Sequence, residues 1–354
     1  MPKSNLLKSP ALKYTIIALA TLGLLYLAFR GQDIGKALSD IGDARWVPLL
    51  GGACIMFLSH GVRALRWQIV LRPLKRRTSL WLAFKATIAG YAMNNLIPRS
   101  GELVRPYMMA RGEKIPMAGT LASVVVERVA DVIGLSALII FSLVSYQSRV
   151  TSIFPSYTVS GLIILLTILL FIMLLFFSER RTKQLVSILT KPFPPKIGAK
   201  IETMALDFSL GLRGLDRSAI LPLIIGTIGI WFLYGISMFV SLQAFPDPAM
   251  SQLTLKDAFL LLTLSGIAFT IPTPGGTGTY HLLIKSGLMI FGVPPAIALA
   301  YAVATHALSY ISITLIGLIF LVGEGLSFGS ARKMKQDDDL HPSTLIPHPS
   351  PENG

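Results

Sequence analysis

The chain has 354 residues, of which 53% are hydrophobic and only 14% are charged. This composition excludes an ordinary soluble domain and predicts an all-α, polytopic helical membrane protein. The formal net charge of +14 does not indicate nucleic-acid binding, because basic cytoplasmic loops account for it in a membrane protein. Cys54 is the single cysteine, so the chain has neither an internal disulfide nor Cys/His metal spacing, and we expect no cofactor.

Six apolar stretches are long enough to cross a hydrocarbon core of about 30 Å, which takes roughly 20 residues. The first follows three lysines and has no small-residue cleavage site after it, so we expect an uncleaved signal anchor. The predicted spans are about 14–30, 46–63, 117–146, 158–178, 219–243 and 296–322.

The charges between the spans predict the orientation of the chain. Residues 63–77 contain six Lys or Arg and no acid, and residues 179–217 contain eight Lys or Arg and four acids. Both stretches should lie in the cytoplasm beneath the plasma membrane, with the N-terminus and the C-terminus on the same side. Residues 196–216 predict an amphipathic helix on the inner membrane surface, and residues 329–354 predict a disordered cytoplasmic tail.

Two polar breaks interrupt the apolar sequence. They are "NNLIPRSGELVRPY" at 94–107 and "FTIPTPGGTGTYHLLIK" at 269–285. The loops keep their predicted sides only if neither interrupted segment crosses the membrane. Residues 80–112 would enter the membrane from the cytoplasm and return to it, and residues 257–291 would enter from outside and return there. We therefore expect two re-entrant broken-helix hairpins. The first contains a stretch, 78–97, that is long enough to span, so it could be deep or fully spanning.

The two breaks belong to an internal repeat with units at about 80–146 and 257–322. In both units an Ile-Pro and a glycine precede a second proline, Pro116 or Pro294, which opens a long apolar helix. Three predicted spans separate the units, and an odd number inverts the second unit relative to the first. The alternative is a chance recurrence of Pro and Gly. We expect one transmembrane domain over residues 1–328.

The breaks are candidate binding sites on physical grounds, because non-helical backbone cannot face lipid and must line protein or a water-filled cavity. A helix begins after each break, near Glu102 and near Gly278, and its free N–H groups could hold an anion. Arg99 and Arg105 add charge-assisted hydrogen bonds that suit phosphate. A phosphate-bearing ligand is therefore expected.

The helix after Pro116 carries three charged residues in apolar surroundings, Glu127, Arg128 and Asp131. Glu127 lies about 16 Å along that helix, near the middle of a core of about 30 Å. Ionisable groups at that depth are costly, face the protein interior and usually pair. We expect a charged lining for a lipid headgroup, in which Arg128 pairs with Asp131.

The predicted headgroup site gathers the polar residues of both breaks and both long helices. Each has a purely structural alternative: interfacial anchoring, an interhelical salt bridge, helix capping, snorkelling or a simple hydrogen bond. The members are Asn94, Asn95, Arg99, Glu102, Arg105, Glu127, Arg128, Asp131, Thr273, Gly275, Gly276, Thr277, Tyr280, His281, Lys285 and His306.

Over about residues 10–325, the chain resembles the lysylphosphatidylglycerol synthase transmembrane-region family. The strings that carry the resemblance are "NNLIPRSGELVRPYMMARGEKIPMAGTLASVVVERVADVIGL" and "IPTPGGTGTYH". Members have Asn-Asn-(Leu/Ile)-x-Pro…Gly-Glu-x-x-Arg, Val-Glu-Arg-x-x-Asp and Pro-Gly-Gly-x-Gly segments. The matching residues are Asn94, Asn95, Pro98, Gly101, Glu102 and Arg105, then Glu127, Arg128 and Asp131, then Pro274, Gly275, Gly276 and Gly278.

The resemblance implies lipid translocation. In two-part members a soluble transferase domain makes an aminoacylated lipid, and the membrane half moves it to the outer leaflet. No connection in this chain is large enough for such a domain, so synthesis is not implied. The chain departs from the family at residues 279–281, where many members have an acidic residue. Common enzyme motifs are absent, and we expect no enzyme.

The sequence hypothesis is a flippase-like transporter that moves a phospholipid or another phosphate-bearing lipid between leaflets through a central polar cavity. One alternative is a non-transporting membrane partner that binds a lipid-linked sugar or isoprenoid for a separate glycosyltransferase. Another is an intramembrane enzyme with Glu127 or His306 as its acid–base group. Candidate partners are the lipid, a second copy of the chain and a separate lipid-modifying enzyme.

Overall fold

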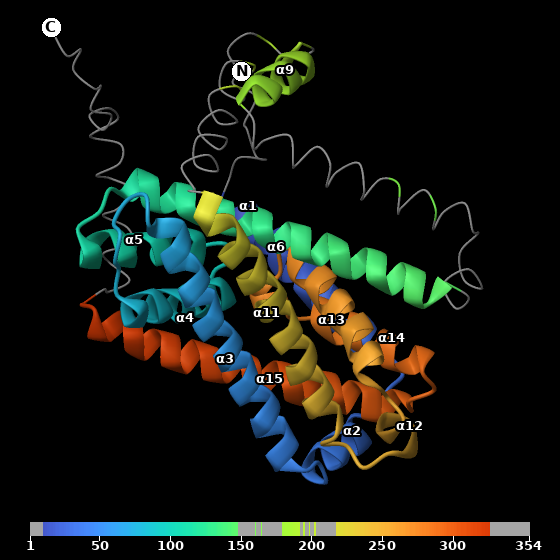
Figure 1. Ribbon diagram of the computed structural model, residues 1–354. Helices are drawn as coiled ribbons and strands as arrows, with labels where there is room; N and C mark the ends of the chain where they lie inside the picture. Colours follow the sequence, from blue (N-terminus) through green and yellow to red (C-terminus); the bar gives the residue numbers. More distant parts are fainter. Residues whose placement is uncertain are drawn as a thin grey trace, which may run out of the picture.

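The computed structural model describes residues 10–147, 179–191 and 217–325, with the single positions 160, 164, 194, 198 and 202. The described part is helical and contains no strand (Figure 1). The predicted span at 158–178, the predicted surface helix at 196–216 and the predicted tail at 329–354 lie outside the described residues, single positions apart.

The helices in chain order alternate between long elements and short ones at the breaks. They are α1 (Pro10–Phe29), α2 (Ile34–Gly42), α3 (Trp46–Leu71), α4 (Leu80–Leu96), α5 (Gly101–Glu113), α6 (Met117–Ser145), α9 (Glu179–Thr190), α11 (Arg217–Leu242), α12 (Pro248–Ser251), α13 (Leu255–Thr270), the 3-10 helix η2 (Pro274–Gly276), α14 (Thr279–Ile290) and α15 (Pro295–Gly323).

Three helices of the described residues are long and apolar enough to cross a membrane, namely α3, α11 and α15. The pair α1 and α2, bent by 82°, would form a fourth crossing if it is one broken span. Helix α6 has 29 residues, but it carries Glu127, Arg128 and Asp131, which set it apart from a purely apolar span. Their charges are paired inside the protein, as described below.

Helix α3 corrects the predicted boundary of the second span. We expected a span over 46–63 followed by a cytoplasmic loop, but the helix continues to Leu71. Arg63 and Arg66 therefore lie within the helix, and both are buried. These two arginines can be buried in a helix because a carboxylate on α6 pairs with them. The pairing offsets the free-energy cost of removing their charges from water.

The two predicted repeat units share the same order of elements. In each, a short helix, a break and a second short helix precede a helix of 29 residues: α4, α5 and α6 in one, and α13, α14 and α15 in the other. Pro116 and Pro294 are the N-caps of the long helices, as the sequence predicts. Each long helix packs on the first short helix of the other unit, α15 on α4 and α6 on α13.

Small residues allow the helices of the first unit to approach closely. A Cβ on Gly101 would overlap the carbonyl oxygen of Gly90, so α5 lies directly against the backbone of α4. Helix α3 packs along α11, and both contact α6 (Figure 1). Helices α4 and α5 are therefore in direct backbone contact where the first break returns.

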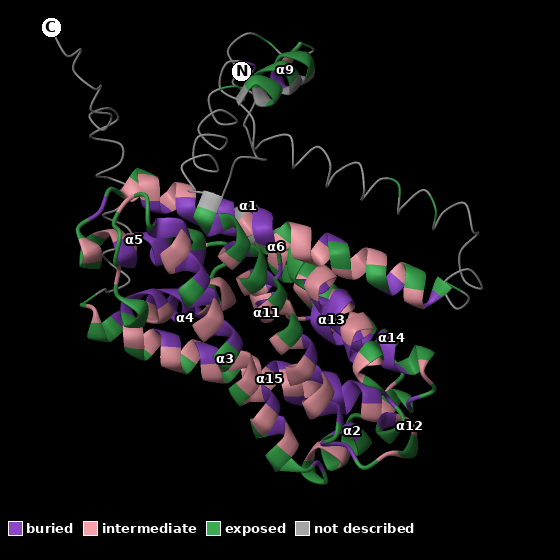
Figure 2. Ribbon diagram, viewed as in Figure 1, coloured by how far each residue is buried: buried purple, intermediate pink, exposed green. Residues whose placement is uncertain are grey.

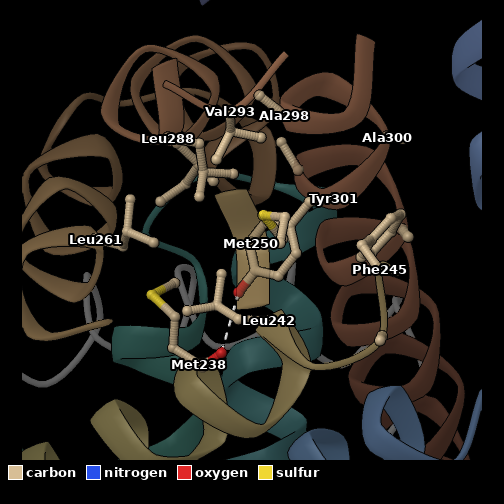
Figure 3. Close-up of a cluster of buried hydrophobic side chains, with 14 of the residues drawn as sticks. Met238, Leu242, Phe245, Met250, Leu261, Leu288, Val293, Ala298, Ala300 and Tyr301 are labelled. Carbon is tan, nitrogen blue, oxygen red and sulfur yellow. Dashed lines mark hydrogen bonds between the residues drawn. The ribbon is translucent and has the colours of Figure 1, made fainter. Parts of the chain in front are cut away.

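Buried side chains form two clusters around the two units (Figure 2). One lies between α3, α4, α5 and α6 and includes Trp67 and Met109, which are essentially inaccessible. The other joins α11 to α13, α14 and α15 (Figure 3). In it the Tyr301 hydroxyl donates a hydrogen bond to the Met238 carbonyl oxygen at 3.3 Å. Each break thus lies beside a buried cluster, while residues 96, 97 and 99 of the first break and 269–272 of the second are exposed.

Candidate functional site: a buried ionic cluster and a histidine pair

Seven charged side chains from α3, α5 and α6 meet inside the helical body. We call them the ionic cluster, and they are Arg63, Arg66, Glu102, Arg105, Glu127, Arg128 and Asp131. The helical spacing of these residues turns them toward one another, since residues three or four apart share a face. The sequence predicted five of the seven.

Asp131 is held by two arginines of α3. Its Oδ2 lies 2.6 Å from Arg63 Nη1, and its Oδ1 lies 2.8 Å from Arg66 Nη2. Arg66 also donates from Nη1 to the Thr227 hydroxyl of α11 at 2.9 Å. The predicted partner, Arg128, is more distant, at 3.7 Å. Asp131 therefore forms closer ion pairs with the two arginines of α3 than with Arg128 of its own helix.

Glu127 is the most deeply buried acid of the ionic cluster, with a side chain that is 1% exposed. Its Oε2 lies 2.5 Å from Arg105 Nη2, and its Oε1 lies 3.4 Å from Arg66 Nη2. The Arg105 guanidinium also lies over the indole of Trp67, at 3.8 Å from the ring centroid. Because Arg105 comes from the first break, this contact fixes the break to α3 and α6.

Arg128 and Glu102 form the accessible edge of the ionic cluster. Their side chains are 40% and 46% exposed, and Arg128 Nε lies 3.7 Å from Glu102 Oε1. An ion pair this long and this exposed is weak. These two side chains are consequently the ones that an arriving ligand can displace at low cost.

The ionic cluster has more positive than negative charge. Four arginines face three carboxylates, which leaves one guanidinium in excess. Within the described residues, the Nε groups of all four arginines lack a hydrogen-bond acceptor. Spare buried donors and an excess positive charge together favour an anionic ligand.

The polar cavity at this point is small. It measures about 10 Å³ and is lined by residues of α4, α5 and α6, including Tyr91, Asn94, Arg105 and Arg128. That volume holds about one water molecule, not a lipid headgroup. The expected central polar cavity is therefore closed in this conformation, and a headgroup could enter only if Arg128 and Glu102 moved.

The start of α5 differs from the predicted anion site. The Gly101 N–H donates to Asn94 Oδ1 at 2.8 Å, and the Glu102 N–H donates to the Arg99 carbonyl at 3.3 Å. Both donors are therefore already used. Asn94 is a capping residue, the alternative that the sequence left open, and the arginine side chains carry the anion-binding capacity.

The second break has its own polar centre, built around His281 of α14 and His306 of α15. We call these two residues the histidine pair; their ring centroids are 4.7 Å apart. His306 Nε2 lies 2.9 Å from the Gly275 carbonyl oxygen, and the Gly278 N–H donates to His281 Nδ1 at 3.3 Å. Tyr280 lies beside them, with its hydroxyl 3.2 Å from Thr305 Oγ1. All described contacts of this centre are uncharged.

Four other predicted site residues of the second break form or permit its backbone conformation. Thr273 Oγ1 lies 3.2 Å from Thr279 Oγ1, which donates to the Gly276 carbonyl at 2.9 Å, and the Thr277 N–H donates to the Pro274 carbonyl. Gly275 and Gly276 have positive φ, which glycine adopts without strain. These residues shape the break.

Two predicted basic site residues lie outside the ionic cluster. Arg99 is exposed at the tip of the first break, with φ of 67°. Lys285 is buried instead of snorkelling to an interface, because its ammonium donates to the Ala28 carbonyl of α1 at 2.7 Å. Neither side chain is placed to share a ligand with the ionic cluster.

The two breaks meet, but their polar groups form two centres instead of one chamber. Asn94 lines the cavity of the first centre, whereas Asn95 donates to the Thr314 hydroxyl of α15 at 2.9 Å. The Tyr310 hydroxyl donates to the Asn95 carbonyl at 3.0 Å, and Tyr310 also contacts His306. Within the described residues, no hydrogen bond or ion pair joins the ionic cluster to the histidine pair.

Helix α3 and its neighbours contribute residues that the sequence did not predict. His60 stacks on Tyr91 with ring centroids 4.9 Å apart, and Tyr234 of α11 lies 3.4 Å from its Nδ1. The spacing of His60, Arg63 and Trp67 in "HGVRALRW" places them on one helix face. That periodicity indicates that the helix continues past residue 63, but the basic residues that follow favoured a loop.

A second cavity lies beside the ionic cluster and is apolar. It measures about 800 Å³ between α6, α11 and α13, and its lining includes Ala130, Thr227, Trp231 and Phe259. Volume alone would make it the principal site, but its lining offers little polar chemistry. Thr227 connects the two features, because it lines this groove and accepts the hydrogen bond from Arg66.

Broken helices that meet beside a buried ionic cluster define the class of this protein: a helical integral membrane protein with a polar interior. The motifs at the two breaks make the class specific. Residues 11–317 match the family described as lysylphosphatidylglycerol synthase TM region, and the chain belongs to that family.

Three relatives are similar over most of the chain. A UPF0104 membrane protein of Methanothermobacter thermautotrophicus is 25% identical, over 92% of this chain and 97% of the relative. A UPF0104 membrane protein of Methanocaldococcus jannaschii is 24% identical, over 76% and 82%. Glycosyltransferase AglD of Haloferax volcanii is 24% identical over 86% of this chain but only 52% of its own length. No solved structure matches.

Proposed function

We propose that this protein is a flippase-like transporter that moves a phosphate-bearing lipid between the leaflets of the plasma membrane. The observation that carries the proposal is the excess guanidinium of the ionic cluster, with spare Nε donors beside the movable pair of Arg128 and Glu102. A phosphate bound there would satisfy buried donors that the protein leaves open. The transporter performs no covalent chemistry in this proposal.

The apolar groove supports a lipid rather than a free phosphate. It lies beside the ionic cluster and shares Thr227 with it, so an amphipathic ligand could place its headgroup at the arginines and a tail in the groove. Acyl chains gain most of their binding energy from apolar contact.

The repeated order of elements supports an inverted repeat with two re-entrant hairpins and six spans in all. In this arrangement, α6 and α15 are related spans, and each packs on the first helix of the other unit. Arg72, Lys75, Arg76 and Arg77 still follow α3 and favour a cytoplasmic position for that end of the helix, with both termini inside. Movement of one unit against the other would open the polar centres alternately.

Reconstitution tests the proposal directly. The full chain in proteoliposomes should exchange a fluorescent phosphatidylglycerol between leaflets faster than empty vesicles, as followed by chemical quenching of the outer leaflet. Arg128→Gln should slow exchange at least about tenfold, since a hydrogen bond to a charged group contributes about 1.5–3 kcal/mol. The matched control is Arg111→Gln, an exposed arginine at the end of α5 outside the ionic cluster.

Two outcomes would overturn the flippase proposal. Exchange equal to that of empty vesicles would exclude lipid movement by this chain. Normal exchange with both Arg128→Gln and Glu127→Gln would exclude the ionic cluster as the headgroup site, whatever the chain transports.

The similarity to AglD favours a second function. That relative is a glycosyltransferase, and the chain spans about half of its length. This chain could bind a lipid-linked sugar or isoprenoid for a separate glycosyltransferase without moving it. Purification in mild detergent, followed by mass spectrometry of the retained lipids, separates the two: a sugar-bearing polyisoprenoid, with no leaflet exchange, would favour the partner function.

A further inference from the structure

The histidine pair holds the second break through backbone hydrogen bonds. A carbonyl oxygen only accepts, so His306 donates from Nε2 to Gly275. A backbone N–H only donates, so His281 accepts at Nδ1 from Gly278 and must carry its own proton on Nε2. His281 is therefore neutral in this conformation, and the break is closed around a neutral imidazole.

A further proton on the histidine pair would act against this closed arrangement. On His281 it could bind only at Nδ1, where it would displace the Gly278 N–H that caps α14. His281 also lies in the first turn of α14, where the helix dipole disfavours a positive charge. With centroids 4.7 Å apart, His281 and His306 would repel if both were charged, so the pair holds at most one extra proton.

The groups around the histidine pair offer no carboxylate in compensation. On α14, Lys285 is engaged with Ala28, and Tyr280 contacts Thr305. On α15, the hydroxyls of Tyr301 and Tyr310 both donate to carbonyl oxygens.

The other elements that touch the pair contribute uncharged groups. Helix α1 presents Phe29, α4 presents Asn95 to the break, and α13 presents Phe269 to Tyr280. Within the described residues, neither histidine forms an ion pair with an acid. The closed break therefore excludes the proton, and an opened break admits it.

The ionic cluster is a poor candidate for the same task. Each of its buried acids already faces at least two guanidinium groups, so its carboxylate oxygens are engaged in ion pairs. His60 contacts Tyr91, and the Arg63 guanidinium lies over the same Tyr91 ring at 5.9 Å from its centroid, so a charge on His60 would lie near an existing cation. The histidine pair, in contrast, has no ion pair with an arginine or an acid among the described residues.

We propose that the histidine pair is a proton-binding site that couples the lipid exchange proposed above to a proton gradient. A proton from the aqueous phase binds as the second break opens, and it leaves from the same imidazole as the break closes, so no other reactant is needed. The coupling part of this inference rests on the proposed function; the proton site itself does not. A proton bound by only the open form shifts the equilibrium by up to about tenfold per pH unit.

Hydrogen–deuterium exchange tests the proton site without lipid transport. In the full chain, exchange of a peptide covering residues 272–282, corrected for the intrinsic effect of pH, should rise between about pH 8 and pH 5. His281→Gln should abolish this rise, because Gln can accept the Gly278 hydrogen bond but cannot take a proton. His306→Gln can still donate to Gly275 and leaves His281 in place, so it should keep the rise. His60→Gln is the matched control and should leave the rise unchanged.

A proteoliposome assay with an imposed pH difference tests the coupling. Wild-type exchange of a fluorescent phosphatidylglycerol should respond to the direction of the gradient, and the response should be lost in His281→Gln. A pH-independent protection of 272–282 in the wild type would overturn the proton site, whether or not lipid moves. A pH-dependent protection without any lipid exchange would overturn the transport function and leave the proton site standing.

Discussion

The buried acid Glu127 gives the sharpest test of the ionic cluster. Glu127→Gln keeps the shape of the side chain but removes its charge. Arg66 would retain Asp131 at 2.8 Å, whereas Arg105 would keep no carboxylate and only its stacking on Trp67. Because the Arg105 side chain is 5% exposed, its charge would stay uncompensated inside the protein.

The expected cost follows from that burial. Removing one partner of a buried ion pair costs about 3–5 kcal/mol, because the remaining charge is desolvated without compensation. The Gln amide still offers a carbonyl oxygen to Arg105, so we expect about 3 kcal/mol. The matched control is Glu102→Gln, whose 46% exposed carboxylate should cost less than about 1 kcal/mol.

The assay is equilibrium unfolding of the full chain in mixed micelles, driven by a denaturing detergent and followed by tryptophan fluorescence and circular dichroism. The double variant Glu127→Gln/Arg105→Met removes the orphaned charge as well, so it should recover most of the lost free energy. Equal stability of Glu127→Gln and Glu102→Gln would refute the assignment of a buried, charge-compensating role to Glu127.

Two further predictions concern the first repeat unit. Gly101→Ala should cost several kcal/mol of stability or prevent folding, because its Cβ would meet the Gly90 carbonyl. Gly61→Ala is the control: it has open space around its Cβ and should stabilise α3 by up to about 1 kcal/mol. Thermal unfolding of the two variants measures the difference. Burial raises the pKa of Glu113, but hydrogen bonds from Lys75 and a backbone N–H outweigh it and lower the pKa below its usual value. Glu113 therefore adds stability above about pH 4.3, which is lost as pH falls through the lower folded pKa. The difference in unfolding free energy between the wild type and Glu113→Gln should decrease as the pH falls from 5 to 3. A difference that stays constant over this range would contradict the prediction.

The positions of the breaks were predictable because they depend on local chemistry. Proline lacks an N–H and fixes φ, so Pro116 and Pro294 mark helix starts wherever the rest of the chain lies. Gly275 and Gly278 adopt positive φ, which few other residues tolerate. The beginnings of α5, α6, α14 and α15 accordingly match the sequence-based expectation.

The membership of the ionic cluster was only partly predictable. Glu127, Arg128 and Asp131 stand out because they interrupt an apolar run on one helix. Arg63 and Arg66 do not, because they adjoin a basic stretch that is typical of a cytoplasmic loop. Their partners lie 61 to 68 positions away in the chain, and no local pattern reports a pairing at that distance.

The amino-acid sequence by itself determined that this is a helical membrane protein of a recognisable family, where its helices are interrupted, and which ionisable residues it commits to an apolar environment. These features follow from hydropathy, proline and glycine, whose effects act within a few residues. The tertiary structure decided that α3 supplies half of the arginines, that the two breaks meet yet keep separate polar centres, and that the polar cavity is closed. Those outcomes depend on which helices pack together, and packing is set by side chains that are distant in the chain.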